Sequence, residues 1–151
     1  MLRQLLLCAL GSVAVSTGTS TASGSPVSYY VSSTTGNDTA VGTSPETAWR
    51  TLSRSSTVSL QAGDSLLLER GSVFADDFLS LAFPTGTIGA YGDARLPRPQ
   101  IVRRWTPGVF GCVTLVNPNA LTVTDIHFAE CVFGLSFELT AGTNASDLVV
   151  Q

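Results

Sequence analysis

The chain has 151 residues, of which 44% are hydrophobic and only 13% are charged, and its formal net charge is −3. All 8 basic residues are arginines, and they form no basic run, which excludes nucleic acid or an acidic membrane surface as the main partner. This length suits one hydrophobic core and is too short for two ordinary domains.

The first 22 residues have the layout of a secretory signal peptide. Arg3 precedes an apolar run over residues 5–15, and small residues follow at 20–22. The run has about 11 residues, whereas a helix that crosses a bilayer needs roughly 20. We expect cleavage after Ala22, a short linker over residues 23–27, and an extracellular chain without membrane attachment. An uncleaved membrane anchor is the alternative interpretation.

Two cysteines, Cys112 and Cys131, remain after this cleavage, and 7 arginines against 11 acidic residues leave a formal charge of −4 (7 minus 11). In an oxidising compartment the cysteines could pair, or they could pack as two buried thiols. The sequence leaves both alternatives open. The tripeptides that begin at Asn37 and Asn144 match the N-glycosylation sequon, and whether they are used is open as well.

A strand-like run at residues 28–31 is followed by a polar loop over residues 32–43 and by the only convincing helix start. Ser44 can cap a helix, Pro45 suits its first position, and Glu46 places a negative charge in the first turn. Trp49 and Leu52 then fall three residues apart. The pattern predicts a short amphipathic helix over residues 45–53 whose apolar face packs against another part of the chain.

From residue 60 onward, short apolar runs alternate with Gly, Pro and acidic residues, which is typical of short strands joined by tight turns. The predicted strands lie at residues 65–68, 73–74, 78–83, 88–91 and 100–102. No segment has a long 3.6-residue apolar period, so the expected class is all-β.

An apolar pattern recurs at an offset of 22 residues in the second half of the chain. Val113 and Leu115 are matched by Leu135 and Phe137, and residues 124–126 and 128 are matched by 146–148 and 150. Leu66 precedes Ile88 by the same offset, and Leu68 precedes Ala90 by it. Such a repeat predicts a coiled β-solenoid.

Three blocks in residues 29–101 carry a family resemblance: YYVSSTTGNDTAVGTSPETAWRTL, LQAGDSLLLERGSVF and IGAYGDARLPRPQI. In this order and spacing they resemble the opening of right-handed parallel β-helix proteins of the pectate-lyase-like superfamily. The resemblance implies a helix that caps the first coil, with Trp49 and Leu52 closing the open end. We therefore expect residues 28–151 to hold the cap and first coils of a β-helix, truncated at the C-terminus.

His127, Asp125 and Asp147 are the first candidates for chemistry. Alternation in residues 122–128 sends Thr122, Thr124 and His127 outward. His127 could act as an acid, a base or a ligand, although a solvated surface imidazole is the favoured interpretation. Asp125 and Asp147 recur at the same register and could hold Ca²⁺ together, but Asp is also simply a good turn residue.

Other candidates are Asp76 with Asp77, and Arg103 with Arg104. Asp76 and Asp77 could be the two carboxyl groups that glycoside hydrolysis requires. Adjacent residues of a strand point to opposite faces, however, so a solvated loop is the favoured interpretation of this pair. Arginine would have to supply the base of a pectate-lyase-like site, because lysine is absent; a solvated loop near Trp105 is favoured for this pair. The catalytic motifs of polygalacturonase-like members are missing. The sequence therefore designates no catalytic, cofactor-binding or metal-binding residue, and leaves cofactors and oligomeric state undefined.

Two functions from different classes follow from the resemblance and the secretion signal. The first is a carbohydrate-active enzyme, a polysaccharide lyase or glycoside hydrolase, whose active groove lies on coils absent from this chain, with a polysaccharide as partner. The second is a non-catalytic β-helix that serves as a surface or adhesion protein. A small β-sandwich binding module is the alternative at the level of fold.

Overall fold

The structure is a computed structural model that describes residues 24–104, 111–142 and 146–151. The predicted signal peptide, Trp105 and the sequon at Asn144 lie outside the described residues. The described chain is predominantly β, with two helical turns, η1 (Pro45–Thr47) and α1 (Leu52–Ser55). The strands are β1 (Ser28–Val31), β2 (Ser65–Glu69), β3 (Val73–Ala75), β4 (Leu79–Ala82), β5 (Gly86–Tyr91), β6 (Gln100–Val102), β7 (Gly111–Val116), β8 (Leu121–Val123), β9 (His127–Ala129), β10 (Phe133–Glu138) and β11 (Val149–Val150).

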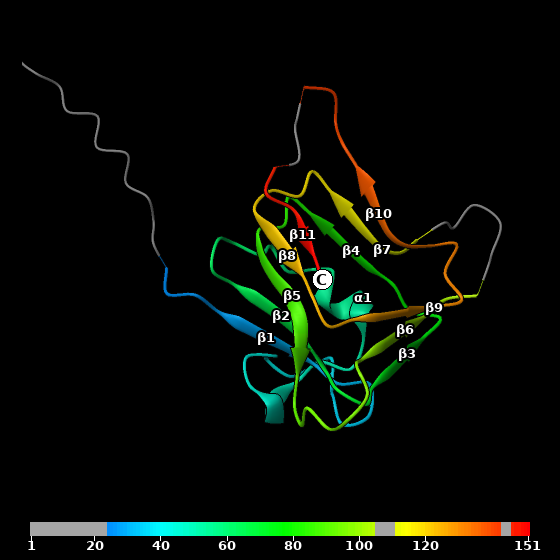
Figure 1. Ribbon diagram of the computed structural model, residues 1–151. Coiled ribbons are helices and arrows are strands. Elements are labelled where there is room, and N and C mark those ends of the chain that lie inside the picture. Colours follow the sequence, from blue (N-terminus) through cyan, green and yellow to red (C-terminus); the bar gives the residue numbers. More distant parts are fainter. Residues whose placement is uncertain (1–23, 105–110, 143–145) are drawn as a thin grey trace, which may run out of the picture.

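Every strand pair is parallel, and the strands form three sheets (Figure 1). The five-stranded sheet has the order β1-β2-β5-β8-β11, and two three-stranded sheets have the orders β3-β6-β9 and β10-β7-β4. From β2 to β11 the chain visits the five-stranded sheet, the β3-β6-β9 sheet and the β10-β7-β4 sheet in a fixed rotation. The expected all-β class and the strands predicted between residues 28 and 102 are confirmed.

The register confirms the 22-residue offset in two places and corrects it in a third. Leu66 pairs with Ile88, and Val113 pairs with Leu135. In the five-stranded sheet, however, Val150 pairs with Val123 and not with Phe128. The predicted match of residues 146–150 to residues 124–128 is therefore wrong, because the length of chain between paired strands changes from one passage of the chain to the next, even within one sheet.

The hydrophobic core lies among the three sheets and draws on all of them. Its side chains come from alternate strand positions, as the pleat requires. The core residues are Leu66, Leu68, Ile88, Leu121 and Val123 of the five-stranded sheet, Phe74 and Ile101 of the β3-β6-β9 sheet, and Leu79, Leu81, Val113 and Leu115 of the β10-β7-β4 sheet, with Val31, Trp49, Leu52, Leu60 and Cys112.

The single helix predicted over residues 45–53 is two separate turns. The start is as expected: Pro45 opens η1, and the Ser44 amide donates to Thr47 Oγ1 at 3.2 Å. The chain then becomes extended, because the backbone of Trp49 forms a parallel bridge with Val31. A new helical turn begins at Leu52, with Thr51 as its N-cap.

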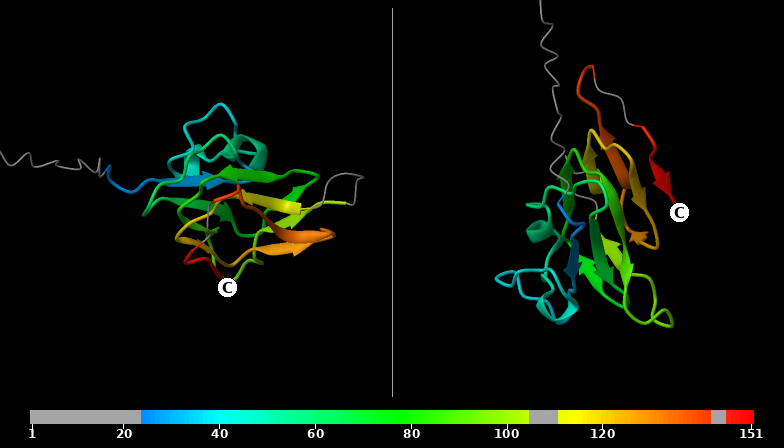
Figure 2. Two further views of the ribbon diagram at one scale, coloured as in Figure 1. Left: turned by 90° about the horizontal axis from the view of Figure 1, so that it is seen from above. Right: turned by 90° about the vertical axis from the view of Figure 1, so that its left-hand side faces the viewer.

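Trp49 and Leu52 nevertheless cover the end of the core that the prediction assigned to them. Trp49 is 3% exposed and Leu52 is fully buried. The Trp49 ring stacks on the Tyr29 ring with their centroids 5.4 Å apart, and the Arg54 guanidinium lies over the Trp49 ring, 4.7 Å from its centroid. Figure 2 shows this segment at one end of the molecule and β10 and β11 at the other.

Cys112 and Cys131 form a disulfide, with their Cα atoms 5.8 Å apart. The bond joins β7 to the turn that precedes β10, and it resolves the choice that the sequence left open. Among the described residues, no helix is both long and apolar enough to cross a membrane. The three short parallel sheets do not by themselves establish the right-handed β-helix of pectate-lyase type that the N-terminal blocks resemble.

Candidate functional site

A hollow of about 340 Å³ lies beside β3, near the end of the molecule that Trp49 covers. It lies between the edge of the β3-β6-β9 sheet and the loops that precede η1 and α1. Its lining residues are Ser33, Arg50, Thr51, Val73, Phe74, Ala75, Asp76 and Asp77.

The wall of the hollow is the outer edge of β3, which pairs only with β6. The Gln100 amide donates to the Ser72 carbonyl, and the Asp76 amide donates to the Val102 carbonyl, each at 2.9 Å. Hydrogen-bonding directions alternate along a parallel strand. The backbone groups of Val73 and Ala75 therefore face away from β6, on the side of the hollow, where no described residue bonds to them.

Asp38 holds the opposite wall in place. Its carboxylate accepts the amides of Arg50 and Thr51 at 2.8 and 3.0 Å, and the Thr51 hydroxyl at 3.0 Å. Burial alone would raise the pKa of Asp38, but the hydrogen bonds from Thr51 and Arg50 together lower it below its ordinary value. Arg50 Nε donates to the Gly36 carbonyl at 2.8 Å. The two terminal nitrogens of Arg50 have no partner among the described residues.

Asp76 and Asp77 both line the hollow, but their carboxylates differ in their hydrogen bonds. The Asp77 carboxylate accepts the amides of Leu52 and Ser53 at 2.5 and 3.1 Å and the Ser53 hydroxyl at 2.6 Å, so it anchors the first turn of α1. Asp76 is exposed, has a positive φ of 55°, and its carboxylate has no partner among the described residues. The two residues are therefore not a matched acid and base.

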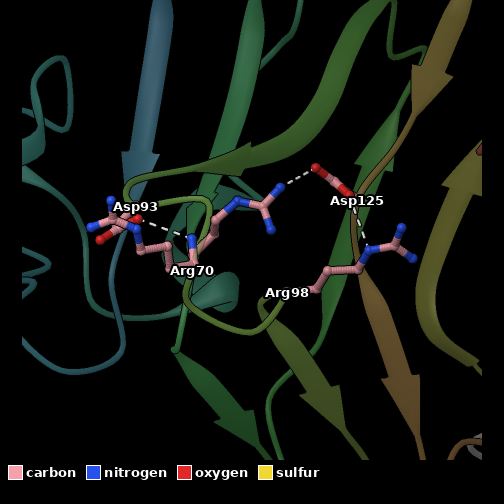
Figure 3. A network of polar contacts seen from close by, with 5 residues as sticks. Arg70, Asp93, Arg98 and Asp125 are labelled. Carbon is pink, nitrogen blue, oxygen red and sulfur yellow. Dashed lines mark hydrogen bonds and ion pairs between the residues drawn. The ribbon is translucent and has the colours of Figure 1, made fainter.

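Asp125 lies in an ion-pair network at the bend between β8 and β9. Arg70 contacts one of its carboxylate oxygens, and Arg98 Nε lies 3.0 Å from the other. Figure 3 shows the two guanidinium groups reaching Asp125 from different sides. The arginines come from the corresponding bends of the two preceding passages of the chain, so the network ties neighbouring bends together.

The predicted stacking of Asp125 with Asp147 is wrong. Because the register of β8 and β11 is offset by more than 22 residues, the Ser146 carbonyl accepts the Ala120 amide, which places Asp147 near the start of β8 and Asp125 near its end. Within the described ranges, no group of three or more His, Cys, Asp or Glu residues lies close enough to hold a metal ion.

The remaining candidates lie at the surface. His127 is exposed on β9, as predicted. Arg103 lies over the Phe78 ring at 4.9 Å and donates to the Gly111 carbonyl at 3.4 Å. Arg104 pairs with the exposed Glu130 at 3.5 Å. The structure does not bring these side chains into one site.

Sequence reasoning missed Arg50, Ser33 and the role of Asp38. Residues of this kind are hard to recognise in a polar loop. Asp38, for example, contacts residues 12 and 13 positions later in the chain, and such contacts follow no sequence period. Asp38 belongs to the sequon of Asn37, whose Oδ1 accepts both the amide and the hydroxyl of Thr39, at 3.0 and 2.9 Å. For Asp38, this short polar turn was the only signal in the sequence.

No family model matches the sequence. The chain is similar to the lacto-N-biosidase of Bifidobacterium longum subsp. longum, with 40% identity over 100 residues. That match covers 61% of this chain and 6% of the curated relative. Crystal structures of the GH136 lacto-N-biosidase from Eubacterium ramulus, a selenomethionine derivative and the native protein, are similar at a TM-score of 0.58 and 28% identity over 78% of this chain. The chain spans 22% and 21% of these solved chains.

These relatives correct the family resemblance. The blocks in residues 29–101 resemble the opening of the pectate-lyase-like superfamily, but the similar proteins are lacto-N-biosidases, and the solved ones belong to GH136. The assignment to the pectate-lyase-like superfamily was wrong because a polar loop, a capping turn and short apolar strands describe how a parallel sheet begins. They contain none of the residues that distinguish one enzyme family from another.

Proposed function

We propose that this chain is the N-terminal part of a secreted glycoside hydrolase that acts on oligosaccharides. The observation that carries the proposal is the similarity to lacto-N-biosidases, found independently in sequence, at 40% identity over 100 residues, and in structure, at a TM-score of 0.58. Both relatives are glycoside hydrolases by name, which favours hydrolysis over the lyase reaction and over a non-catalytic surface protein.

The arrangement of the strands favours a structural role for this part of the enzyme. We propose that the three sheets are the faces of a parallel solenoid in which each turn adds one strand to each face, because the chain visits the sheets in a fixed rotation. Such a solenoid grows by stacking. The solenoid turns in this chain would then form the first part of the stack, with its end covered by Trp49, and later turns would stack on them.

The acidic residues support an active centre elsewhere in the enzyme. Glycoside hydrolysis requires two carboxyl groups that flank the scissile bond. Among the described residues, Asp38, Asp64 and Asp77 bind backbone amides, and Asp125 binds two arginines. Groups committed in this way are not free to act as an acid or a nucleophile. Asp76 has a carboxylate without a partner among the described residues, but Asp77, the other carboxylate in the hollow, is bound to α1. We therefore propose that the catalytic pair lies on later turns.

The test is an assay of the gene product that contains this chain, recovered from the culture medium, against an aryl glycoside of lacto-N-biose and a panel of other aryl glycosides. We expect the aryl alcohol to be released from at least one of them, and the N-terminus of the secreted protein to lie near residue 23. A folded protein, checked by circular dichroism, that releases nothing from the whole panel would overturn the proposal.

A further inference from the structure

We propose that the hollow beside β3 is a binding subsite for a neutral sugar. The inference rests on the proposed function, because it takes the class of ligand from there, and it adds a site away from the proposed catalytic pair. Three properties of the hollow carry it: the polar groups that line it, the apolar surface of its wall, and its size.

The polar groups suit a ring that carries several hydroxyl groups. Each sugar hydroxyl both donates and accepts a hydrogen bond. The Asp76 carboxylate accepts only, and the guanidinium of Arg50 donates only. The Ser33 hydroxyl and the backbone groups of Val73 and Ala75 offer both functions. Arg50 Nε and the Ser33 amide already donate hydrogen bonds, to the Gly36 carbonyl and the Ser72 hydroxyl. The other groups named here have no hydrogen-bond partner among the described residues, so the site can bind a ring without breaking existing bonds.

The wall and the volume suit a ring of this kind. Val73 is 48% exposed and presents an apolar side chain next to the polar groups, as a sugar with one hydrocarbon face requires. The volume of about 340 Å³ is at the lower end of ligand-binding pockets, which span roughly 300–1,000 Å³. One or two sugar rings are the ligands of that size.

Other classes of ligand fit less well. Calcium requires six to eight oxygen ligands, whereas Asp76 supplies the one carboxylate of the hollow that is not already bound to the backbone. A phosphate or carboxylate group would meet two carboxylates in the hollow, Asp76 and Asp77, against the one guanidinium of Arg50. An extended peptide would need a longer edge than β3, which has 3 residues.

The experiment titrates the full chain with galactose, N-acetylglucosamine and lacto-N-biose, and follows the backbone amides by two-dimensional NMR. The variants are Asp76→Asn and, as a matched control, Glu130→Gln. Glu130 follows β9 as Asp76 follows β3 in the same sheet, and both residues are exposed with positive φ, 57° and 55°. Asn tolerates this conformation well, so the backbone should stay in place.

We expect at least one of these sugars to shift the amides of Val73, Ala75 and Asp76. Asp76→Asn should weaken this binding about tenfold, because it replaces a charged acceptor with a neutral amide oxygen, which forms a weaker hydrogen bond. Glu130→Gln should leave the binding unchanged. The inference is overturned if no sugar shifts these amides, or if the two variants behave alike. An enzyme that cleaves its glycoside while the hollow binds no sugar would refute this subsite alone and leave the proposed function standing.

Discussion

The two ends of the molecule use the same parallel pairing but bury their apolar side chains to very different degrees. At the Trp49 end, Leu52 and Leu66 are fully buried. At the opposite end, Phe133 is 56% exposed and Phe137 is 43% exposed, although β10 pairs with β7 over most of its length. Strand pairing alone therefore does not bury a side chain.

The difference lies in what covers each end. The edge of β1 is covered by the Trp49 bridge, and α1 lies against β4. At the opposite end, β9, β10 and β11 are the last strands of their sheets within the described residues. Residues in the middle of a stack have a neighbouring strand on both sides, and this second neighbour removes the remaining surface from water.

Deleting a core side chain at the covered end should have the largest effect. Leu66→Ala should lower the free energy of unfolding by about 2–5 kcal/mol, because it leaves a cavity next to Ile88. The matched deletion at the opposite end, Phe137→Ala, should cost about 1 kcal/mol or less, because that ring is already 43% exposed. Urea denaturation measures both. Equal losses would show that the two ends are packed alike.

The disulfide should be the main source of stability at the less covered end. Cys112 and Cys131 are 19 residues apart, and a crosslink over a loop of this length stabilises by about 3 kcal/mol in the chain-entropy model. The double variant Cys112→Ala and Cys131→Ala should lose about this amount. The same chain under a reducing agent is the control. A double variant as stable as the oxidised chain would contradict the expectation.

The anchoring of α1 by Asp77 should contribute less. Asp77→Ala removes the acceptor of two helix-start amides, and a lost cap costs about 0.5–2 kcal/mol. Asp76→Asn is the neighbouring control, since the Asp76 carboxylate has no partner among the described residues and Asn tolerates its positive φ of 55°. Thermal unfolding of both variants separates the contribution of the Asp77 carboxylate from that of Asp76. A larger loss from Asp76→Asn would reverse the assignment.

Alkaline pH should have the smallest effect, and it should act through Tyr91. Burial, with further contributions from Glu69 and Tyr30, raises the pKa of Tyr91 from 10.0 to about 12. A raised pKa means that the folded chain holds this proton more tightly, so its contribution is fully present below pH 10 and is lost as the pH rises through about 12. Tyr91→Phe should flatten the fall in melting temperature across this window. An unchanged slope would assign the fall to other groups.

Much of the fold could be predicted because its signals are local. The alternation in residues 65–68 and the turn residues around them located β2, and Pro45 located the start of η1. The bridge of Trp49 to Val31 could not be predicted, because it joins a loop to a strand edge far away in sequence. The register of β11 failed for a related reason: a single repeat length cannot describe sheets whose connecting segments differ.

The candidate site was less predictable than the fold. Asp76 and Asp77 attracted attention as a pair, and they do lie in the hollow, but the pair is divided because Asp77 is bound to α1. Arg50 and Ser33 had no signal at all, since a solvated loop and a pocket wall have the same composition. Only the three-dimensional arrangement distinguishes them.

The packing of Trp49 gives this protein a built-in optical probe. The chain has 2 tryptophans, and only Trp49 lies in the described part of the structure. Its ring is 3% exposed, stacks on Tyr29 and donates from Nε1 to the Ala40 carbonyl at 2.9 Å. With Trp105 replaced by Phe, the fluorescence of the remaining indole would report on the covered end alone. Its wavelength would change when that end opens, whatever happens to the strands at the opposite end.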